Sequence, residues 1–157
     1  ALLHATCPTE HLYVQCLLIH VLCAFFSVKG VKVIGHDTTV IYGENATLLC
    51  QLTETDESIT RIIWMKKTRE NPKEDIFFAI RPDGKTEHQN GLGDRVQFIG
   101  NVAEKNGSIQ LLRMRLLDDG IYTCVFNLFP SGAFKTFIDA TVFGMMACSY
   151  FFSDLQQ

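Results

Sequence analysis

The sequence has no surplus of positive charge. Its 157 residues include 14 Lys and Arg against 17 Asp and Glu, for a net charge of -3, and only 20% of the residues are charged. A nucleic-acid partner needs a basic surface, so the composition gives no electrostatic case for one. The apolar share of 47%, with twelve Phe, is sufficient for a core. The length favours a single domain, and disorder is not expected as its main state.

Long apolar runs are also scarce. The run from Leu12 to Phe26 is shorter than the roughly 20 residues that a membrane-spanning helix needs. An apolar run of this kind followed by small residues predicts a secretory signal peptide over residues 1–30, with cleavage after Ala24 or Gly30. The first residues carry no positive charge, so a buried core segment is the alternative interpretation.

The C-terminal tail, residues 144–157, is apolar over too short a stretch to span a bilayer. We therefore expect no membrane span in this chain. Two hypotheses follow. The chain is either the extracellular part of a single-pass cell-surface protein, or a secreted form that acts as a soluble, truncated decoy.

Catalytic motifs are missing as well. There is no Gly-x-Ser-x-Gly elbow and no His-Glu-x-x-His pair. Ala79–Thr86 fits a loose phosphate-loop pattern, but no helical period follows it, so a β-turn is the preferred interpretation. His36 and His88 have no second ligand at metal-binding spacing. We predict a protein that is not an enzyme and has no cofactor or metal, with a nucleotide binder as the minor alternative.

Few cysteines lie in the body of the sequence. Of six, three fall in the predicted signal peptide and Cys148 falls in the tail. The two that remain, Cys50 and Cys124, suggest a disulfide if the domain is secreted. Asn45 and Asn106 each begin an Asn-x-Ser/Thr sequence and are the predicted glycosylation sites. Together these features favour an extracellular protein.

Short alternating runs broken by turn residues fill the region between Val31 and Phe143. This pattern predicts an all-β sandwich. No helical period of 10–15 residues separates the runs, which argues against a parallel α/β sheet. The expected strands are residues 45–52, 61–67, 75–80, 95–99, 108–114, 121–126 and 133–143.

The order of three residues in these strands resembles the pattern of an immunoglobulin domain. Cys50, Trp64 and Cys124 occur in the Cys…Trp…Cys order of that fold, in which the Trp packs on the disulfide that joins the two sheets. Tyr122 lies two residues before Cys124, at the position of the tyrosine corner. The resemblance implies that the Tyr122 hydroxyl forms a hydrogen bond to the backbone a few residues earlier in the chain.

The turn before residues 121–126 extends the resemblance. Asp118-x-Gly120-x-Tyr122-x-Cys124 is similar to the family pattern at this turn, which implies that Asp118 pairs with Arg95 across the base of the sandwich. The long span between Trp64 and Arg95 leaves room for the additional strands C′ and C″. We therefore predict an immunoglobulin variable-type (V-set) Greek-key β-sandwich over residues 31–143.

Alternation along the strands predicts an apolar outer face. If Trp64, Cys124 and their neighbours point inward, another set of side chains points outward from the same sheet. An apolar strip on that face indicates a partner site, whereas scattered residues, or residues covered by the chain's own tail, would be harmless. The predicted outward set is Ile63, Met65, Val125, Asn127 and one of Phe77 and Phe78, taken as Phe77.

The loop after residues 121–126 gives a more specific resemblance. Phe129-Pro130-Ser131-Gly132 is similar to the Thr-Tyr/Phe-Pro-x-Gly signature of the nectin and poliovirus-receptor-like family, with Leu128 in place of the threonine. In that family two V domains dock face to face through strands C, C′, F and G. The loop aromatic of each domain enters a pocket on the other.

Carried over to this chain, the resemblance implies that Phe129 is inserted into the partner. Pro130, Gly132 and Ala79 would line the receiving pocket. Thr86 occupies the position where the family has a glycine, so the outer wall of this pocket departs from the pattern. The implied partner is another immunoglobulin-superfamily cell-surface protein, a nectin or nectin-like molecule or a second copy of the chain. Residues Cys124–Phe129 are also similar to paired V-type glycoproteins, so a ligand of myeloid inhibitory receptors is the alternative.

Overall fold

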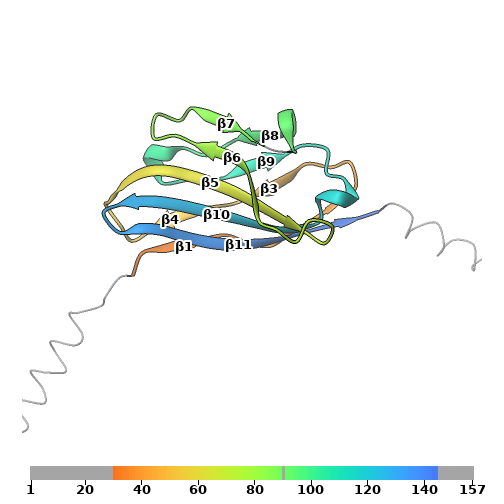
Figure 1. The fold of residues 1–157 in the computed structure, drawn as a ribbon, viewed down its shortest axis with the longest axis horizontal. Helices are drawn as coiled ribbons and strands as arrows, with labels where there is room; N and C mark the ends of the chain where they lie inside the picture. The colour runs from red at the N-terminus through yellow and green to blue at the C-terminus, as the bar shows by residue number, and fades with distance from the viewer. Residues whose placement is uncertain (1–29, 90, 145–157) are drawn as a thin grey trace, which may run out of the picture. The chain divides into compact units, whose positions relative to one another are not determined.

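The computed structural model of the chain describes residues 30–89 and 91–144. The predicted signal peptide before Gly30, the tail after Gly144 and Cys148 lie outside the described residues. Figure 1 shows the described part as β-strands joined by turns and short helices. No α-helix occurs in this part, and the prediction of an all-β sandwich is confirmed. Three single-turn 3-10 helices lie between strands: η1 (Gly93–Arg95), η2 (Val102–Glu104) and η3 (Leu116–Asp118).

The larger sheet has six strands in the order β2-β11-β10-β5-β6-β7. Neighbouring strands are antiparallel, except that β2 and β11 run parallel. Their bounds are β2 Thr38–Ile41, β5 Ser58–Thr68, β6 Asp75–Ile80, β7 Thr86–His88, β10 Gly120–Phe129 and β11 Gly132–Phe143. In immunoglobulin naming, β5 with Trp64 is strand C and β10 with Tyr122 and Cys124 is strand F. The strands that follow them, β6 and β11, are C′ and G.

The second layer consists of smaller sheets. One has the order β3-β9-β8, and the other pairs β1 with β4. Strands β3 and β4 are separated by only two residues, so one stretch of chain contributes to both sheets. The bounds are β1 Lys32–Ile34, β3 Ala46–Leu48, β4 Gln51–Thr53, β8 Val96–Phe98 and β9 Ile109–Leu111.

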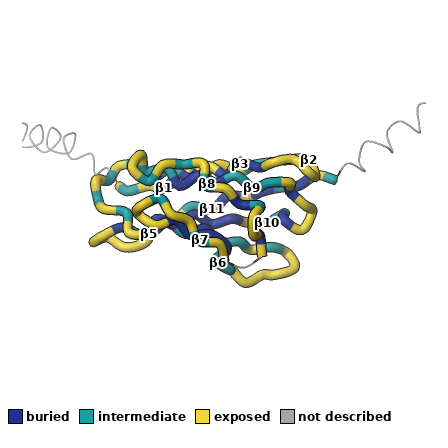
Figure 2. The backbone as a smooth tube through the Cα atoms, turned by 90° about the horizontal axis from the view of Figure 1, so that it is seen from above, coloured by how far each residue is buried: buried dark blue, intermediate teal, exposed yellow. Residues whose placement is uncertain are grey.

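The core lies between the two layers, and Figure 2 shows buried residues along strands of both. Trp64 is fully buried, and its indole N–H donates a hydrogen bond to the carbonyl of Gly107 at 2.9 Å. The disulfide between Cys50 and Cys124 joins the layers, which confirms the predicted pairing. Each fully buried large apolar side chain contributes about 1.5–3 kcal/mol relative to exposure. The largest are Trp64, Tyr122, Phe78, Phe126, Leu48, Leu52, Ile62, Ile80, Ile109, Leu111, Met114 and Ile138.

A β-bulge in β6 changes the direction of one predicted surface residue. Trp64 pairs with Phe78, but Met65 pairs with Ile76, so Phe77 is the extra residue between them. A bulge of this kind interrupts the alternation of side chains. Phe77 is only 2% exposed and packs edge-on against Tyr122, with ring centroids 5.8 Å apart. The prediction that Phe77 faces a partner is therefore wrong, because both Phe77 and Phe78 are core residues.

Gly120 begins β10 at a point where the backbone of β5 leaves no room for a side chain. A Cβ at this position would lie 2.4 Å from the carbonyl oxygen of Lys67. We expect Gly120→Ala to lower the free energy of unfolding by about 2 kcal/mol, because the strands must separate to accommodate the methyl group. Urea denaturation followed by Trp64 fluorescence measures the change. Gly144→Ala is the matched control, since its Cβ would meet Leu116 at an ordinary 3.7 Å; equal effects of the two substitutions would contradict the prediction.

Candidate docking face and its supporting network

The turn between β10 and β11, Phe129–Gly132, presents an aromatic ring to solvent. Phe129 is 70% exposed, whereas the preceding Leu128 is buried in the core. Pro130 follows through a cis peptide bond, and Gly132 has a φ of 90° in the left-handed region that favours glycine. We call these four residues the FG turn. The buried Leu128 thus anchors the end of β10, and the ring of Phe129 lies beyond it.

Further apolar side chains lie on the outer face of β5, β10 and β11, beyond Asn127 and its partner Arg61. Ile63, Met65 and Asn127 are partly exposed, and Val125 is only 9% exposed. Phe137 is 56% exposed, and the Lys135 ammonium lies 5.0 Å from its ring centroid. Sequence reasoning missed Phe137, although it is adjacent to the buried Ile138 and alternation would have placed it outward. We call these residues together with Phe129 the docking face.

Ala79 lies on the outer side of the sheet but is closed off from solvent. It pairs with Ile63 on β5 and with Glu87 on β7. The Arg61 guanidinium of β5 contacts the Glu87 carboxylate at 2.6 Å, so this side chain has to cross β6. Ala79 is accordingly 0% exposed. The expectation that Ala79 lines the receiving pocket is wrong, because this residue is fully buried in the structure.

The middle of the sheet is covered in a similar way. Thr123 on β10 is fully buried, although alternation turns it toward the outer side. Its hydroxyl donates a hydrogen bond to the carboxylate of Glu74, from the loop before β6. The exposed apolar area of the docking face is therefore concentrated near β11 and the FG turn.

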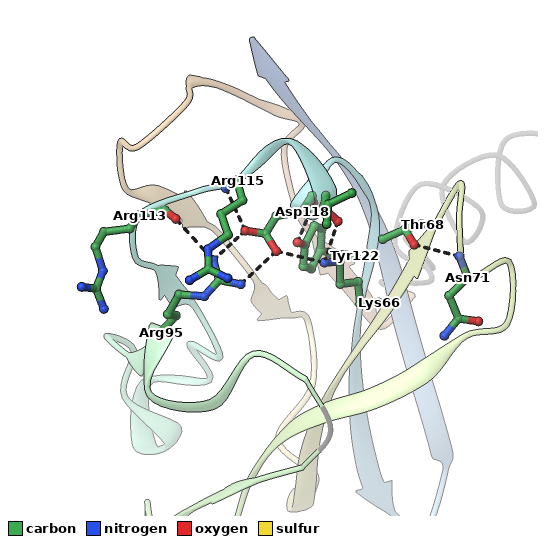
Figure 3. A network of polar contacts seen from close by, with 9 residues as sticks. Lys66, Thr68, Asn71, Arg95, Arg113, Arg115, Asp118 and Tyr122 are labelled. Atoms are coloured by element: carbon green, nitrogen blue, oxygen red, sulfur yellow. Dashed lines mark hydrogen bonds and ion pairs between the residues drawn. The ribbon is translucent and has the colours of Figure 1, made fainter. Parts of the chain in front are cut away.

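The base of the sandwich carries a network around Asp118, shown in Figure 3. The Asp118 carboxylate accepts hydrogen bonds from both terminal nitrogens of Arg95, at 2.6 and 3.0 Å. The backbone N–H of Arg115 donates to it at 2.9 Å, and Lys66 does so at 3.2 Å. The Tyr122 hydroxyl donates to the Asp118 carbonyl at 2.7 Å. The network therefore ties the turn before β10 to η1 and to β5.

The protonation states of the titratable side chains in the network follow from their surroundings. Burial alone would raise the pKa of the Asp118 carboxyl, but the hydrogen bonds from Arg95 and Arg115 and the charge of Lys66 outweigh it, so the pKa is lowered. The hydrogen bond to Asp118 raises the pKa of Arg95. Burial raises the pKa of the Tyr122 hydroxyl. At neutral pH the cluster is an ionised pair beside a neutral phenol, which suits a structural role.

A hollow of about 340 Å³ lies beside this network and is lined in part by Lys66, Arg95, Asp118 and Phe77.

In residues 30–89 and 91–144, no three His, Cys, Asp or Glu side chains are grouped so that they could hold a metal ion. In that same part of the chain, no helix has the length and hydropathy needed to cross a membrane.

The two glycosylation acceptors lie on the second layer. Asn45 directly precedes β3, is exposed, and accepts a hydrogen bond from the backbone N–H of Arg113 at 3.0 Å. Asn106 is partly exposed and forms isolated bridges with Gln51 and Asn101. Glycosylation of Asn45 and Asn106 stays a prediction.

Comparison with known proteins agrees with this geometry. The family model for the immunoglobulin V-set domain matches residues 35–143. The chain is similar to the mouse protein named junctional adhesion molecule-like, with 27% identity over 92 residues, and this match covers 56% of the chain and 24% of that protein. It is also similar to the rat OX-2 membrane glycoprotein, with 29% identity over 131 residues, which covers 80% of the chain and 44% of that protein. The chain thus spans less than half the length of these relatives. The matched region contains both layers, the disulfide and the docking face, and the chain belongs to the immunoglobulin V-set family.

Proposed function

We propose that this domain is a cell–cell recognition module that docks through the docking face with Phe129 as its anchor. The observation that carries this proposal is the 70% exposure of Phe129 on a turn fixed to the sheet by a buried neighbour. An aromatic ring is rigid and has a large area, so it contributes much burial at little cost in conformational entropy.

The chemistry around Phe129 supports the same proposal. Phe137 adds a second exposed ring on β11, and Ile63 and Met65 of β5 are partly exposed on the same side of the sheet. Polar groups are interspersed with these residues: Lys135 pairs with Val125, and Asn127 pairs with Arg61 between Val125 and Phe129. Specific protein interfaces combine apolar contacts with hydrogen-bonding groups in this way. A standard interface buries about 1,200–2,000 Å² in total.

The proposed partner is another immunoglobulin-superfamily cell-surface protein, a nectin or nectin-like molecule or a second copy of this chain. The resemblance of the FG turn to the nectin and poliovirus-receptor-like family supports it. The segment Leu128–Phe137 also resembles the corresponding hairpin of the leukocyte receptor Tactile. One relative is named as an adhesion molecule, which agrees with this class. We infer an extracellular location, on a single-pass membrane protein or in a secreted decoy form.

A second candidate function is a V-type ligand for a myeloid inhibitory receptor. The similarity to OX-2 membrane glycoprotein favours it, because this match covers 80% of the chain. The same face would serve both functions, so the partner distinguishes them. A binding screen of multimers of the chain on cells expressing nectins, nectin-like proteins or myeloid receptors decides which class binds.

Phe129→Ala is expected to weaken partner binding by at least about 2 kcal/mol, close to thirtyfold in dissociation constant, as substitution of anchoring aromatics does. The ring has little packing within the domain, so the thermal midpoint should stay unchanged. Titration of the multimer on cells that bind the wild type measures the affinity.

The matched control is Phe143→Ala. Phe143 is 55% exposed at the opposite end of β11, so its substitution removes a comparable exposed ring far from the FG turn. Equal affinity of folded Phe129→Ala and wild type would reject the anchoring role. Equal losses from both substitutions would reject its localisation to the FG turn.

A further inference from the structure

We propose that Glu57, in the loop between β4 and β5, is a positioning residue that holds the FG turn in the conformation presented to the partner. The proposal rests on the proposed function of that turn. The Glu57 carboxylate accepts a hydrogen bond from the Ser131 backbone N–H at 3.1 Å and another from the Ser131 hydroxyl at 2.5 Å. Within residues 30–89 and 91–144, these are the hydrogen bonds that tie residues 130–132 to another loop.

A β-bulge in β5 brings Glu57 to this position. Asn127 pairs with Arg61, but Leu128 pairs with Ile59, so Thr60 is the extra residue in β5. The Thr60 hydroxyl donates to the carbonyl of Asn127 at 3.0 Å and holds the bulge against β10. A bulge redirects the residues beyond it. After the shift, Phe129 pairs with Ser58, and the residue before Ser58 comes alongside the FG turn.

The loop that carries Glu57 is itself fixed from its other side. The Glu57 backbone N–H donates to the Thr55 hydroxyl at 3.1 Å. The Lys105 ammonium, from the end of η2, donates to the carbonyl of Thr55 and contacts the Asp56 carboxylate at 3.2 Å. Lys105 has a φ of 58° and ends η2 in the left-handed region. Glu57 is therefore the last residue of the loop in a series of contacts that runs from the end of η2, through Thr55, to Ser131.

Such a contact matters because the ring of Phe129 has little packing to fix its direction. A turn that moves in the free protein must be ordered when the partner docks, and this ordering reduces affinity. When a carboxylate accepts hydrogen bonds from both the backbone N–H and the side chain of one residue, it restricts the backbone and the side chain of that donor residue. Glu57 would thus raise affinity without touching the partner, by holding the turn before docking.

The test compares Glu57→Ala with Glu57→Gln in the full chain. We expect Glu57→Ala to lower the ¹⁵N heteronuclear NOE at Ser131 and Gly132, and to weaken binding about tenfold through lost preorganisation. Glu57→Gln retains one acceptor oxygen and should recover most of both quantities. Adding Ser131→Ala to Glu57→Ala should cause no further loss, since Glu57→Ala already removes the acceptor of the Ser131 hydroxyl. Thermal midpoints should differ little, because the contact is at the surface.

Glu44→Ala is the matched control, because Glu44 is also an exposed carboxylate that accepts a backbone N–H, that of Ile41 at 3.3 Å. It should leave the NOE of the FG turn and the binding unchanged. The binding probe is a fluorescent multimer of the full chain on cells expressing nectins or nectin-like proteins.

Three results would overturn the positioning role. An unchanged NOE in Glu57→Ala shows that the contact does not order the turn. A lowered NOE with unchanged binding, while Phe129→Ala still weakens binding, refutes the positioning role and leaves the proposed function standing. If neither Phe129→Ala nor Glu57→Ala affects binding, or the wild type binds none of these cells, the proposed function fails and the role of Glu57 fails with it.

Discussion

Replacing both Cys50 and Cys124 with alanine is expected to leave the domain largely unfolded at 37 °C. The disulfide closes a loop across a sequence separation of 74 residues. In the chain-entropy model, a crosslink over so long a loop contributes about 4 kcal/mol by restricting the unfolded chain. Domains of this size have a total free energy of unfolding of about 5–15 kcal/mol. Loss of the crosslink and of its packing against Trp64 therefore removes much of the total.

Thermal and guanidinium denaturation of the oxidised wild type and the double variant, followed by far-ultraviolet circular dichroism, measures this loss. Reduction of the wild type should give the same destabilisation as the double substitution. A reduced domain with an unchanged midpoint would contradict the prediction, because it would mean that the two layers hold together without the covalent link.

The second large effect is expected for Asp118→Asn. The substitution keeps the shape of the side chain but leaves Arg95 and Lys66 side by side without their counter-charge. Breaking a nearly buried ion pair from one side costs about 3 kcal/mol or more, because the remaining charge is desolvated and unpaired. Urea denaturation at pH 7 measures the loss. Asp119→Asn is the matched control, since the neighbouring carboxylate accepts a hydrogen bond from the uncharged backbone N–H of Val142, at 3.0 Å.

The destabilisation caused by Asp118→Asn is expected to depend on pH. The folded pKa of Asp118 is lowered from the ordinary value of 3.8, so the unfolded state takes up the proton first as the pH falls. The stability contributed by the charged carboxylate is therefore complete above about pH 5 and is lost as the pH falls through the folded pKa. The difference in unfolding free energy between wild type and Asp118→Asn should be constant from pH 5 to 7 and shrink below about pH 4. A difference that is unchanged at pH 3 would show that the charge of Asp118 is not what stabilises the base.

The sequence was sufficient to predict the parts of this fold that depend on one residue type at a fixed spacing. Cys50 and Cys124 define the disulfide, and Trp64 is the indole packed between the layers. Alternation indicated on which face of its sheet each side chain lies. The pairing of Asp118 with Arg95 came from the family resemblance, since nothing in the spacing of two charges 23 residues apart fixes a contact.

What the sequence could not predict depends on the register between strands. A single extra residue in β6 turns Phe77 into the core, and a single extra residue in β5 brings Glu57 to the FG turn. Neither bulge has a glycine or proline to mark it. Glu87 pairs with the buried Ala79, and its carboxylate contacts Arg61 on a strand from which it is separated by a third. Such contacts between long side chains follow from the sheet order and the rotamers, which alternation does not determine.

Strand β11 runs without interruption from the FG turn to Phe143, a span of twelve residues. At about 3.3 Å per residue, its two ends lie roughly 40 Å apart. Gly144 therefore lies at the end of the sandwich opposite Phe129. A tether attached there would hold the aromatic tip outermost, where a molecule from a facing surface meets it before it meets the remainder of the domain.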